Sequence, residues 1–395
     1  MELIGNVKNY DWGKLGAESY VAKIATANDG GFKLDQAKPY AELWMGDHVS
    51  GPSLVAGSSE ELGAYLQKNS QNKLTYLFKV LSIRKALSIQ VHPDKTEAEK
   101  LHAQFPDVYK DPNHKPELAI ALTDFQAMCG FRPYAEIHNL LKSWPQLETL
   151  LGKDKIDQLQ SGTEPALKDL YSTLMHSPPK ALETCITSML ATIRTKPSPT
   201  DLDRLFLQLH EDFSADVGLL SIYFLNILNL KPGQAIYLPA NVPHAYLSGD
   251  CIECMACSDN VVRAGLTPKF KDVDTLLRLL SYEGAPAESK IYQPKRLDAD
   301  GQPHTRTFIP SVRDFAVAEV KVPAGVKEYS VTNRAKGCIL LVCSGKGKLI
   351  AEGQELGLEF GKIVFVPGSA GDKLRLEIED SGSEFVAYQA MSNDF

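Results

Sequence analysis

The sequence predicts a mostly β protein with a helical insert. Short apolar segments separated by Gly, Pro and Asp, the pattern of strands and turns, occupy residues 1–133 and the part of the chain after residue 218. Between residues 134 and 218 the apolar residues instead recur at helical spacing, and Leu182, Ile186 and Leu190 form one such series. A chain of 395 residues also exceeds one simple core, so we expect two or three domains.

The composition is typical of an intracellular globular protein. A net charge of -7 argues against non-specific binding to nucleic acid or anionic membranes, but leaves room for a local basic pocket. The first residues lack a signal-peptide pattern, and no apolar run is long enough to span a membrane. Seven cysteines, an odd number in a large acidic chain, indicate reduced thiols. We therefore expect a soluble cytoplasmic protein, which we take to be a monomer.

Two buried strands are predicted in the apolar segment LTYLFKVLSIRKALSIQVHP, residues 74–93. A polar interruption at residues 82–85 separates them. Because side chains alternate across a strand, Gln90 and His92 project from the same face of the second strand, and Pro93 then ends it. This spacing suits two ligands of a single metal ion.

A helix and a loop are predicted before the next strand. Thr96 and Glu99 form a capping box at the start of a short helix. The loop that follows places Glu117 just before an apolar strand, and the proline after Lys115 biases that lysine toward an extended conformation. In an extended chain Lys115 and Glu117 share a face, and His114 beside them is a further candidate for the site.

His244 begins the densest polar stretch of the chain, which runs to Lys269 and follows a strand-like segment that ends at Pro239. Residues 248–250, Ser-Gly-Asp, indicate a turn between two short strands. A sheet can present a metal-binding side chain at the end of its strands in this way. Taken alone, however, a histidine at the end of a strand is more often a hydrogen-bonded structural residue than a metal ligand.

The C-terminal part of the chain, from about Tyr282, is predicted to form a second all-β unit. The heptapeptide at residues 233–239 recurs in chemical type at residues 361–367, with Asp372 at the place of His244. We therefore expect a second β-barrel that lacks the metal. The predicted division is a catalytic domain of residues 1–133 and 219–281, a helical domain of residues 134–218 and a C-terminal domain of residues 282–395.

Four side chains form the best candidate metal site, namely Gln90, His92, Glu117 and His244. Antiparallel strands of a closed barrel converge on its interior, and a catalytic zinc takes nitrogen and oxygen ligands with one position open. This ligand set suits zinc or manganese better than copper. Each residue also has an ordinary structural explanation by itself, since Gln90 can cap a strand, His92 can pack in a core and Glu117 can be an exposed acid.

A thiolate zinc site is the rival interpretation for Cys251, Cys254 and Cys257. Thiolate sites usually need paired Cys-x-x-Cys motifs with a second pair elsewhere. On a strand, Cys254 also faces away from the other two cysteines. We interpret them as buried reduced thiols.

Two long motifs carry a resemblance to a known family. Residues 109–117, YKDPNHKPE, and residues 244–269 resemble the two signature motifs of the type I mannose-6-phosphate isomerases, and SIQVHPDK, AELWMG and NYDWG resemble further landmarks. The resemblance implies a cupin (jelly-roll) zinc enzyme with a helical insert that interconverts mannose 6-phosphate and fructose 6-phosphate. It implies one zinc ion per chain on the four residues above, a sugar phosphate as substrate, and a supply of mannose for GDP-mannose synthesis and glycosylation.

The resemblance places the family's active-site arginine on Arg263. A guanidinium is always charged and binds two oxygens at once, so Arg263 is our first choice to stabilise a cis-enediolate, and phosphate binding is its alternative role. Lys115 is the candidate acid or base, and Asp259 and Glu253 are rival bases.

The remaining candidates are assigned to substrate binding. They are Ser88, Lys95, Tyr246 and Glu253.

Two other functions stay open at this point. An iron oxygenase of the same fold would use two histidines and one carboxylate, and the extra amide of Gln90 favours the isomerase instead. A sugar-phosphate sensor without activity would be expected to have lost a ligand or Arg263, and the sequence retains all of them.

Overall fold

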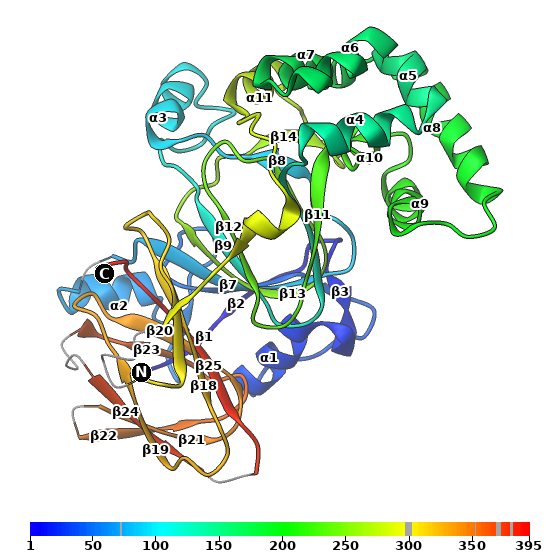
Figure 1. The fold of residues 1–395 in the computed structure, drawn as a ribbon. Coiled ribbons are helices and arrows are strands. Elements are labelled where there is room, and N and C mark those ends of the chain that lie inside the picture. Colours follow the sequence, from blue (N-terminus) through cyan, green and yellow to red (C-terminus); the bar gives the residue numbers. More distant parts are fainter. Residues whose placement is uncertain (72, 297–301, 352, 369–372, 380–381) are drawn as a thin grey trace.

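The computed structural model describes residues 1–71, 73–296, 302–351, 353–368, 373–379 and 382–395. The prediction of a mostly β protein with a helical region is confirmed, with 32% of residues in strands and 29% in helices. The strand pairs within the sheets are antiparallel. The helical group lies at one end of the molecule and the C-terminal strands lie at the other, with the central sheet between them (Figure 1).

The central sheet contains eleven strands within the described residues. Its strands are β2 (Asn6–Lys8), β5 (Glu42–Met45), β7 (Tyr76–Ile83), β8 (Ile89–Val91), β9 (Glu117–Ala121), β10 (Phe125–Phe131), β11 (Leu225–Leu230), β12 (Ala235–Leu238), β13 (His244–Ala256), β14 (Val262–Gly265) and β15 (Ile291–Tyr292).

Strand β13 organises this sheet. Its first part pairs with β10 and β8, and its part after Gly249 pairs with β7 and β9. Gly249 has φ +110°, and a Cβ atom there would lie 2.4 Å from the carbonyl oxygen of Asp124. Glycine therefore lets one long strand change partners without breaking. The predicted turn at residues 248–250 is wrong for this reason.

Most of the helices lie between β10 and β11 in the chain, and a few lie elsewhere. The α-helices are α1 (Tyr20–Asn28), α2 (Leu62–Lys68), α3 (Lys95–Gln104), α4 (Tyr134–Lys142), α5 (Pro145–Leu151), α6 (Lys153–Gln158), α7 (Glu164–Met175), α8 (Pro179–Arg194), α9 (Asp201–Phe213), α10 (Gly218–Ser221) and α11 (Val273–Leu279). Short 3-10 turns are η1 (Gly16–Glu18), η2 (Leu159–Ser161) and η3 (Ala287–Lys290).

The start of α3 differs from the prediction. The helix begins at Lys95 and its N-cap is Asp94, whose carboxylate accepts the backbone N–H of Glu97 at 2.8 Å. An aspartate at the N-cap satisfies one of the free N–H groups of the first turn. The predicted capping box of Thr96 and Glu99 therefore lies inside the helix.

The C-terminal strands form two further sheets, one of which also takes up N-terminal strands. The eight-stranded sheet contains β16 (Lys295–Arg296), β17 (Thr305–Phe308), β18 (Ala316–Val322), β25 (Phe385–Met391), β20 (Cys338–Ser344), β23 (Ile363–Val366), β1 (Glu2–Ile4) and β6 (Leu54–Val55). The four-stranded sheet contains β19 (Glu328–Thr332), β24 (Lys373–Ile378), β21 (Gly347–Ala351) and β22 (Gln354–Leu358), and a separate pair joins β3 (Lys14–Leu15) to β4 (Pro39–Tyr40).

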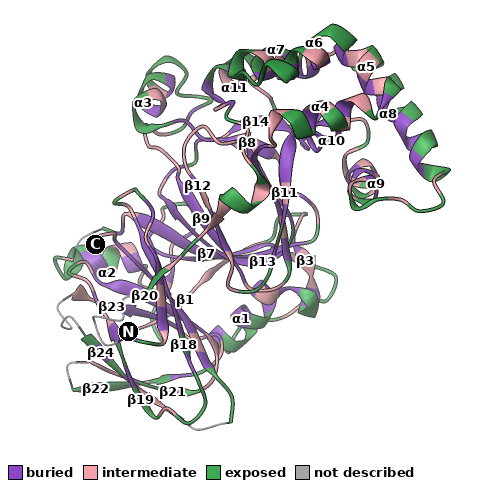
Figure 2. Ribbon diagram, in the orientation of Figure 1, coloured by how far each residue is buried: buried purple, intermediate pink, exposed green. Residues whose placement is uncertain are grey.

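The apolar core that fills the helical group continues into the central sheet. One cluster of buried side chains includes Leu170 and Ile186 of the helices together with Ile89 and Val91 of β8 and Val262 of β14. Strands β7 and β9 are buried along their length, whereas the helices expose their outer faces (Figure 2). The helical group is therefore packed against the two strands that carry Gln90 and Arg263.

The repeated heptapeptide forms the same local structure in both places. Gly233 and Gly361 have φ of +83° and +86°, and each is followed two residues later by a strand, β12 or β23. A left-handed glycine in a turn before a buried strand explains the echo in the sequence. Asp372, which we matched to His244, lies outside the described residues.

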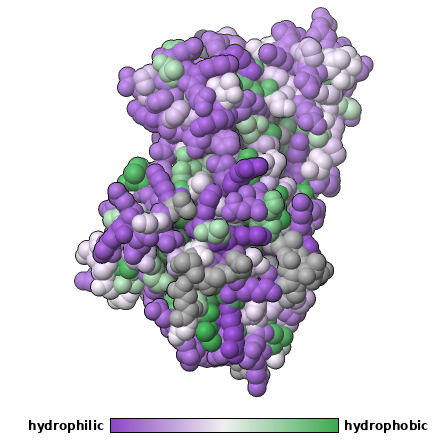
Figure 3. Space-filling model, turned by 90° about the vertical axis from the view of Figure 1, so that its left-hand side faces the viewer, coloured by the Kyte–Doolittle hydropathy of each residue, from purple (hydrophilic) through white to green (hydrophobic). Residues whose placement is uncertain are grey.

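The surface shown in Figure 3 is mostly hydrophilic, with hydrophobic residues scattered over it. Within the residues that the structure describes, no helix has the length and apolar character that crossing a bilayer requires.

Candidate metal centre and adjoining pocket

The candidate ligands come from three strands that meet at one place. Gln90 is the central residue of β8, and His92 follows the end of that strand. Glu117 opens β9 and His244 opens β13. Gln90 lies opposite His244 on one neighbouring strand and opposite Arg263 on the other. Pairing register therefore places Gln90 between the histidine and the arginine.

Three of these side chains form a compact buried cluster. The Oε2 atom of Glu117 lies 3.5 Å from Nε2 of His92 and 3.3 Å from Nε2 of His244. The exposed fraction of each side chain is at most 2%. Within the described part of the chain, this is the one group of three or more His, Cys, Asp or Glu residues whose ligand atoms lie within 4.8 Å of one another.

Both imidazole rings are fixed by backbone carbonyls. Nδ1 of His92 lies 2.7 Å from the carbonyl oxygen of Asn260, and Nδ1 of His244 lies 2.8 Å from that of Val242. When Nδ1–H donates to a carbonyl, the proton is absent from Nε2 of a neutral ring. The Nε2 lone pairs then point toward Glu117, which is the arrangement of metal-binding histidines.

Charge and hydrogen bonding at the cluster both fit a bound cation. Burial lowers the pKa of His92 to about 4, so its imidazole is neutral at pH 7. Burial alone would raise the pKa of Glu117, but Lys115 and His92 hold it well below its usual range. Nε2 of His92 and Oε2 of Glu117 have no hydrogen-bond partner among the described residues. Buried polar atoms normally have one, so a metal ion would supply what these two atoms lack.

Gln90 faces the same cluster with its amide group. Its Nε2 atom lies 3.5 Å from Nε2 of His244. The oxygen of an amide is the atom that binds a cation, and a half turn of the group exchanges the oxygen and nitrogen positions. Gln90 is thus placed to complete a set of four ligands with His92, Glu117 and His244.

Lys115 occupies the second oxygen of Glu117. Its Nζ atom lies 3.1 Å from Oε1 of Glu117, and 12% of the lysine side chain is exposed. Glu117 therefore directs one oxygen to the histidines and the other to a partly accessible ammonium group. The predicted shared face of Lys115 and Glu117 places a potential proton donor beside the metal centre.

A pocket of about 520 Å³ adjoins the centre through Gln90. Ser88, Arg263 and Lys269 line it together with Lys85. Arg263 is half-buried, burial lowers its pKa, and no hydrogen bond or ion pair to its side chain occurs among the described residues. A guanidinium without a partner in a basic pocket is suited to bind an anion.

The other residues predicted for substrate binding or proton transfer do not line this pocket. Tyr246 is buried and its hydroxyl has no hydrogen-bond partner among the described residues, whereas Glu253 accepts a hydrogen bond from Lys79 at 3.0 Å. Asp259 is exposed after β13. Lys95, at the start of α3, donates to the side chain of Asn113 at 3.0 Å.

The sequence analysis missed two residues that support the site. Lys79 is buried within β7 between Glu253 and Glu42, which raise its pKa despite burial. A lysine in the middle of the apolar run YLFKVLSI was an available signal for it. Asn260 holds the ring of His92 through its backbone oxygen, a role that no side-chain pattern indicates.

The cysteines do not assemble into a site. Cys251 packs in one core cluster and Cys254 in another, as opposite faces of β13 require. Burial raises the pKa of both thiols. Cys251 and Cys254 are therefore core residues with free thiols, whereas Cys257, also predicted to be buried, is half-buried.

Comparison with known proteins gives consistent matches over the chain. Residues 1–134 match the family described as phosphomannose isomerase type I, catalytic domain, and residues 146–225 match its helical insertion domain. The mannose-6-phosphate isomerases of Rattus norvegicus and Homo sapiens are 42% and 40% identical, and each alignment covers 94% of both chains. A mutant of phosphomannose isomerase from Salmonella typhimurium superposes with a TM-score of 0.85 at 29% identity, covering 99% of both chains. A zinc-bound mannose 6-phosphate isomerase gives 0.84 at 30% identity and the same coverage.

Proposed function

Because the chain belongs to the type I phosphomannose isomerase family, we propose that it interconverts D-mannose 6-phosphate and D-fructose 6-phosphate. The observation that carries this proposal is the position of Gln90, which faces His244 in the buried cluster and also lines the pocket that contains Arg263. A metal centre for the reacting oxygens and a cation for developing negative charge then belong to one site.

The proposed metal is zinc, with one ion per chain. Its ligands are Nε2 of His92, Nε2 of His244, Oε2 of Glu117 and the amide oxygen of Gln90. Two imidazoles and two oxygen ligands suit zinc, and a related structure at 30% identity is zinc-bound. When bound, zinc supplies a Lewis acid that polarises the carbonyl and hydroxyl oxygens of the open-chain sugar.

The proton transfer is assigned to Lys115. Aldose and ketose differ by a proton moved between C1 and C2 through a cis-enediol, so an acid or base must reach these atoms. Nζ of Lys115 lies at the metal centre against Glu117 and is partly accessible. Glu253 and Asp259 are alternative bases; Glu253 accepts a hydrogen bond from Lys79 and Asp259 is exposed, whereas Lys115 pairs directly with the proposed ligand Glu117.

Arg263 is assigned to the negative charge of the enediolate. Its position opposite Gln90 on β14 places it next to the metal centre, and a guanidinium binds two adjacent oxygens. Ser88, Lys85 and Lys269 line the same pocket and are placed to bind the phosphate. Binding energy from the phosphate then orients the reacting carbons. The geometry favours these three residues over Lys95, which contacts Asn113.

The wider roles follow the same proposal. The catalytic domain consists of residues 1–133 and 219–281 and has a cupin fold, the inserted helical domain consists of residues 134–218, and residues 282–395 form a metal-free β domain. We further propose that the protein is a cytoplasmic monomer that supplies mannose for GDP-mannose synthesis and glycosylation. Sedimentation of the purified chain tests the monomer, and a second species at the mass of a dimer would contradict it.

A coupled assay with mannose 6-phosphate, before and after chelation, tests the proposed reaction, with the metal content measured in parallel. We expect turnover that disappears with the metal and returns with zinc. Reaction in D₂O should place deuterium at C1 or C2 of the product to the extent that the base exchanges its proton with solvent before returning it. Turnover that survives complete metal removal would contradict the metal's role.

An iron oxygenase remains the alternative that the two-histidine, one-carboxylate cluster would also suit. The amide of Gln90 at the same centre favours the isomerase. Running the assay without oxygen separates the two activities, because an isomerase keeps its full rate and an oxygenase loses it.

A further inference from the structure

The segment that carries Lys115 has no helix or strand of its own. We call residues 110–116 the Lys115 loop; they lie between α3 and β9. Irregular backbone has no ladder of hydrogen bonds to fix it, so contacts with other segments must set the direction of Lys115.

One side of the Lys115 loop is held by the segment after β13. The side chain of Asn260 donates to the carbonyl oxygens of Asp111 and Asn113 at 2.6 and 3.0 Å. The backbone N–H of Asp259 donates to the carboxylate of Asp111 at 2.8 Å. These bonds fix residues 111–113, and the backbone N–H of Ala256 in β13 donates to the carbonyl oxygen of Pro116 at 3.2 Å, which leaves Lys115 and His114 between the two held points.

The other side of the loop is held from the C-terminal part of the chain. Nε2 of His114 lies 3.0 Å from Oδ2 of Asp314, and the exposed fractions of the two side chains are 23% and 21%. This is the one hydrogen bond that the His114 side chain makes within the described residues. His114 precedes Lys115, so the contact acts one peptide bond from the catalytic candidate.

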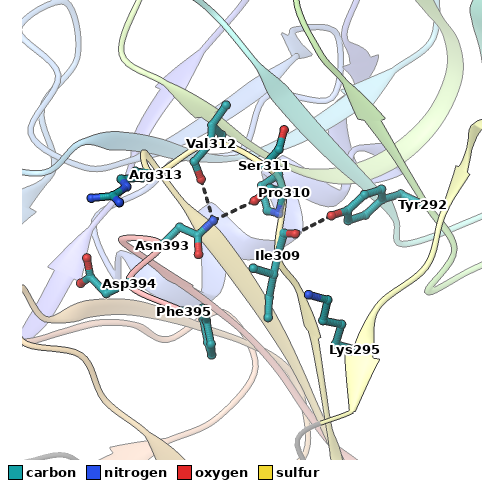
Figure 4. Close-up of a pocket in the computed structure, with 10 residues that line it drawn as sticks. All are labelled: Tyr292, Lys295, Ile309, Pro310, Ser311, Val312, Arg313, Asn393, Asp394 and Phe395. Carbon is teal, nitrogen blue, oxygen red and sulfur yellow. Dashed lines mark hydrogen bonds between the residues drawn. The ribbon is translucent and has the colours of Figure 1, made fainter.

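Hydrogen bonds from other parts of the chain hold the segment that contains Asp314. The hydroxyl of Thr75 donates to the carbonyl oxygen of Asp314 at 2.5 Å. The side chain of Asn393 donates to the carbonyl oxygens of Pro310 and Val312 at 2.8 and 2.6 Å (Figure 4). The hydroxyl of Tyr292 donates to the carbonyl oxygen of Ile309 in the same segment. The carboxylate of Asp314 is thus presented from a fixed position between the central sheet and the C-terminal strands.

We propose that Asp314 is a positioning residue for the isomerisation, which holds His114 and through it directs Nζ of Lys115 toward Glu117. This inference rests on the proposed function and gives the C-terminal part of the chain a role at the active site. Small displacements of a reacting group lower the rate strongly, so a side chain that only orients Lys115 still affects turnover.

Asp314→Ala tests the proposal directly. We expect kcat to fall about tenfold, with KM for mannose 6-phosphate changed less than about twofold and zinc content unchanged. Asp314→Asn retains an oxygen that accepts the His114 hydrogen bond, so it should recover most of the rate. A kcat for Asp314→Ala within about twofold of the wild type would overturn the proposal.

The matched control is Glu2→Gln. Glu2 and Lys362 form an ion pair between distant parts of the chain with nearly the same exposed fractions, 22% and 23%, and neither residue contacts the Lys115 loop among the interactions described. We expect wild-type kcat for this variant. An equal loss of rate in Glu2→Gln would show a general effect of weakened packing and would contradict a positioning role.

A double-mutant cycle tests whether Asp314 acts through His114. Adding Asp314→Ala to His114→Ala should change kcat less than about twofold, because the partner is already absent. The same tenfold loss in that background would contradict the proposal.

Hydrogen exchange of the zinc-loaded, full-length protein adds a measurement that does not depend on turnover. Exchange in the peptide that covers residues 110–116 should be about tenfold faster in Asp314→Ala and unchanged in Glu2→Gln. Absence of turnover in the wild type would reject the proposed function, whereas unchanged exchange in Asp314→Ala would reject the contact as an anchor of the loop.

Discussion

Two buried glutamates, one in the central sheet and one in the C-terminal strands, differ in how their oxygens are bonded. Glu117 in β9 directs Oε2 at two imidazoles and that atom has no hydrogen-bond partner among the described residues. Glu319 in β18 has both oxygens in use, since Arg306 pairs with Oε2 and the hydroxyl of Tyr388 donates to Oε1 at 3.1 Å. Both acids are at most 4% exposed.

The difference lies in what surrounds each carboxylate, since the unbonded oxygen of Glu117 faces two imidazoles whereas both oxygens of Glu319 are bonded. The two units share a left-handed glycine before a buried strand, at Gly233 and Gly361. A buried carboxylate costs free energy unless it is paired. Glu319 is satisfied by its neighbours, whereas Lys115 pairs with only one oxygen of Glu117 and a metal ion would satisfy the other. Similar strands therefore support a site in one unit and a packed core in the other.

Among the substitutions considered, Glu117→Gln should have the largest effect on zinc content and kcat. Loss of the carboxylate removes a ligand and its charge, so we expect loss of zinc and a fall in kcat of at least about a thousandfold. Zinc content and turnover of the purified variant give both values. A variant that keeps full zinc occupancy would remove Glu117 from the ligand set.

Arg263→Ala distinguishes enediolate stabilisation from phosphate binding as the role of Arg263. The unpaired guanidinium is expected to stabilise the enediolate, so kcat should fall about 10²- to 10³-fold with zinc content intact. Steady-state kinetics distinguishes the two roles of Arg263. A rise in KM with kcat unchanged would assign Arg263 to the phosphate instead.

Glu319→Gln is the counterpart in the C-terminal unit. Removing one partner of a buried charge-assisted pair should lower the free energy of unfolding by about 2 kcal/mol. Zinc content and kcat of the folded protein should match the wild type. Denaturant unfolding measures the first, and a loss of zinc in this variant would contradict the separation of the two glutamates.

Asp203→Asn tests the helical insert with the smallest effect. Asp203 forms a capping box with Thr200 and pairs with Lys196 at 2.8 Å. Burial raises its pKa, but Lys196 and Thr200 lower it further, so the pKa in the folded protein is below the ordinary value. At pH 7 the variant should be less stable by about 1 kcal/mol, with kcat unchanged.

The pH dependence follows from the sign of that shift. A lowered folded pKa contributes stability that is complete above the unfolded pKa of about 3.9 and is lost as the pH falls through the folded pKa. Thermal unfolding of the wild type and of Asp203→Asn should therefore converge as the pH falls through the lowered folded pKa of Asp203. A stability difference that stays constant through this range would contradict the charged state as its cause.

The buried cluster of candidate ligands could be predicted in part from the sequence. Strand alternation placed Gln90 and His92 on one face, and the expected convergence of antiparallel strands grouped them with Glu117 and His244, the set that the family resemblance also implies. The turn at residues 248–250 was wrong because the left-handed Gly249 continues β13 and does not end it. Lys79 was missed although its position in an apolar strand signals a buried charge.

Other features depend on contacts that the sequence pattern does not encode. The carbonyl of Asn260 fixes His92, and a backbone oxygen has no residue-type signature. His114 and Asp314 are 200 residues apart and meet only because the C-terminal sheet packs beside the central one. Such pairs require the tertiary arrangement, which periodicity and motifs do not specify.

Titration of the metal-free chain with zinc, with mannose 6-phosphate turnover followed at each step, tests whether the buried cluster holds one catalytic zinc ion. We expect the rate to rise in proportion to added zinc and to stop rising at one ion per chain. Glu117→Gln should show no rise over the same range. Full turnover in the metal-free chain, or a rise in Glu117→Gln equal to that of the wild type, would contradict it.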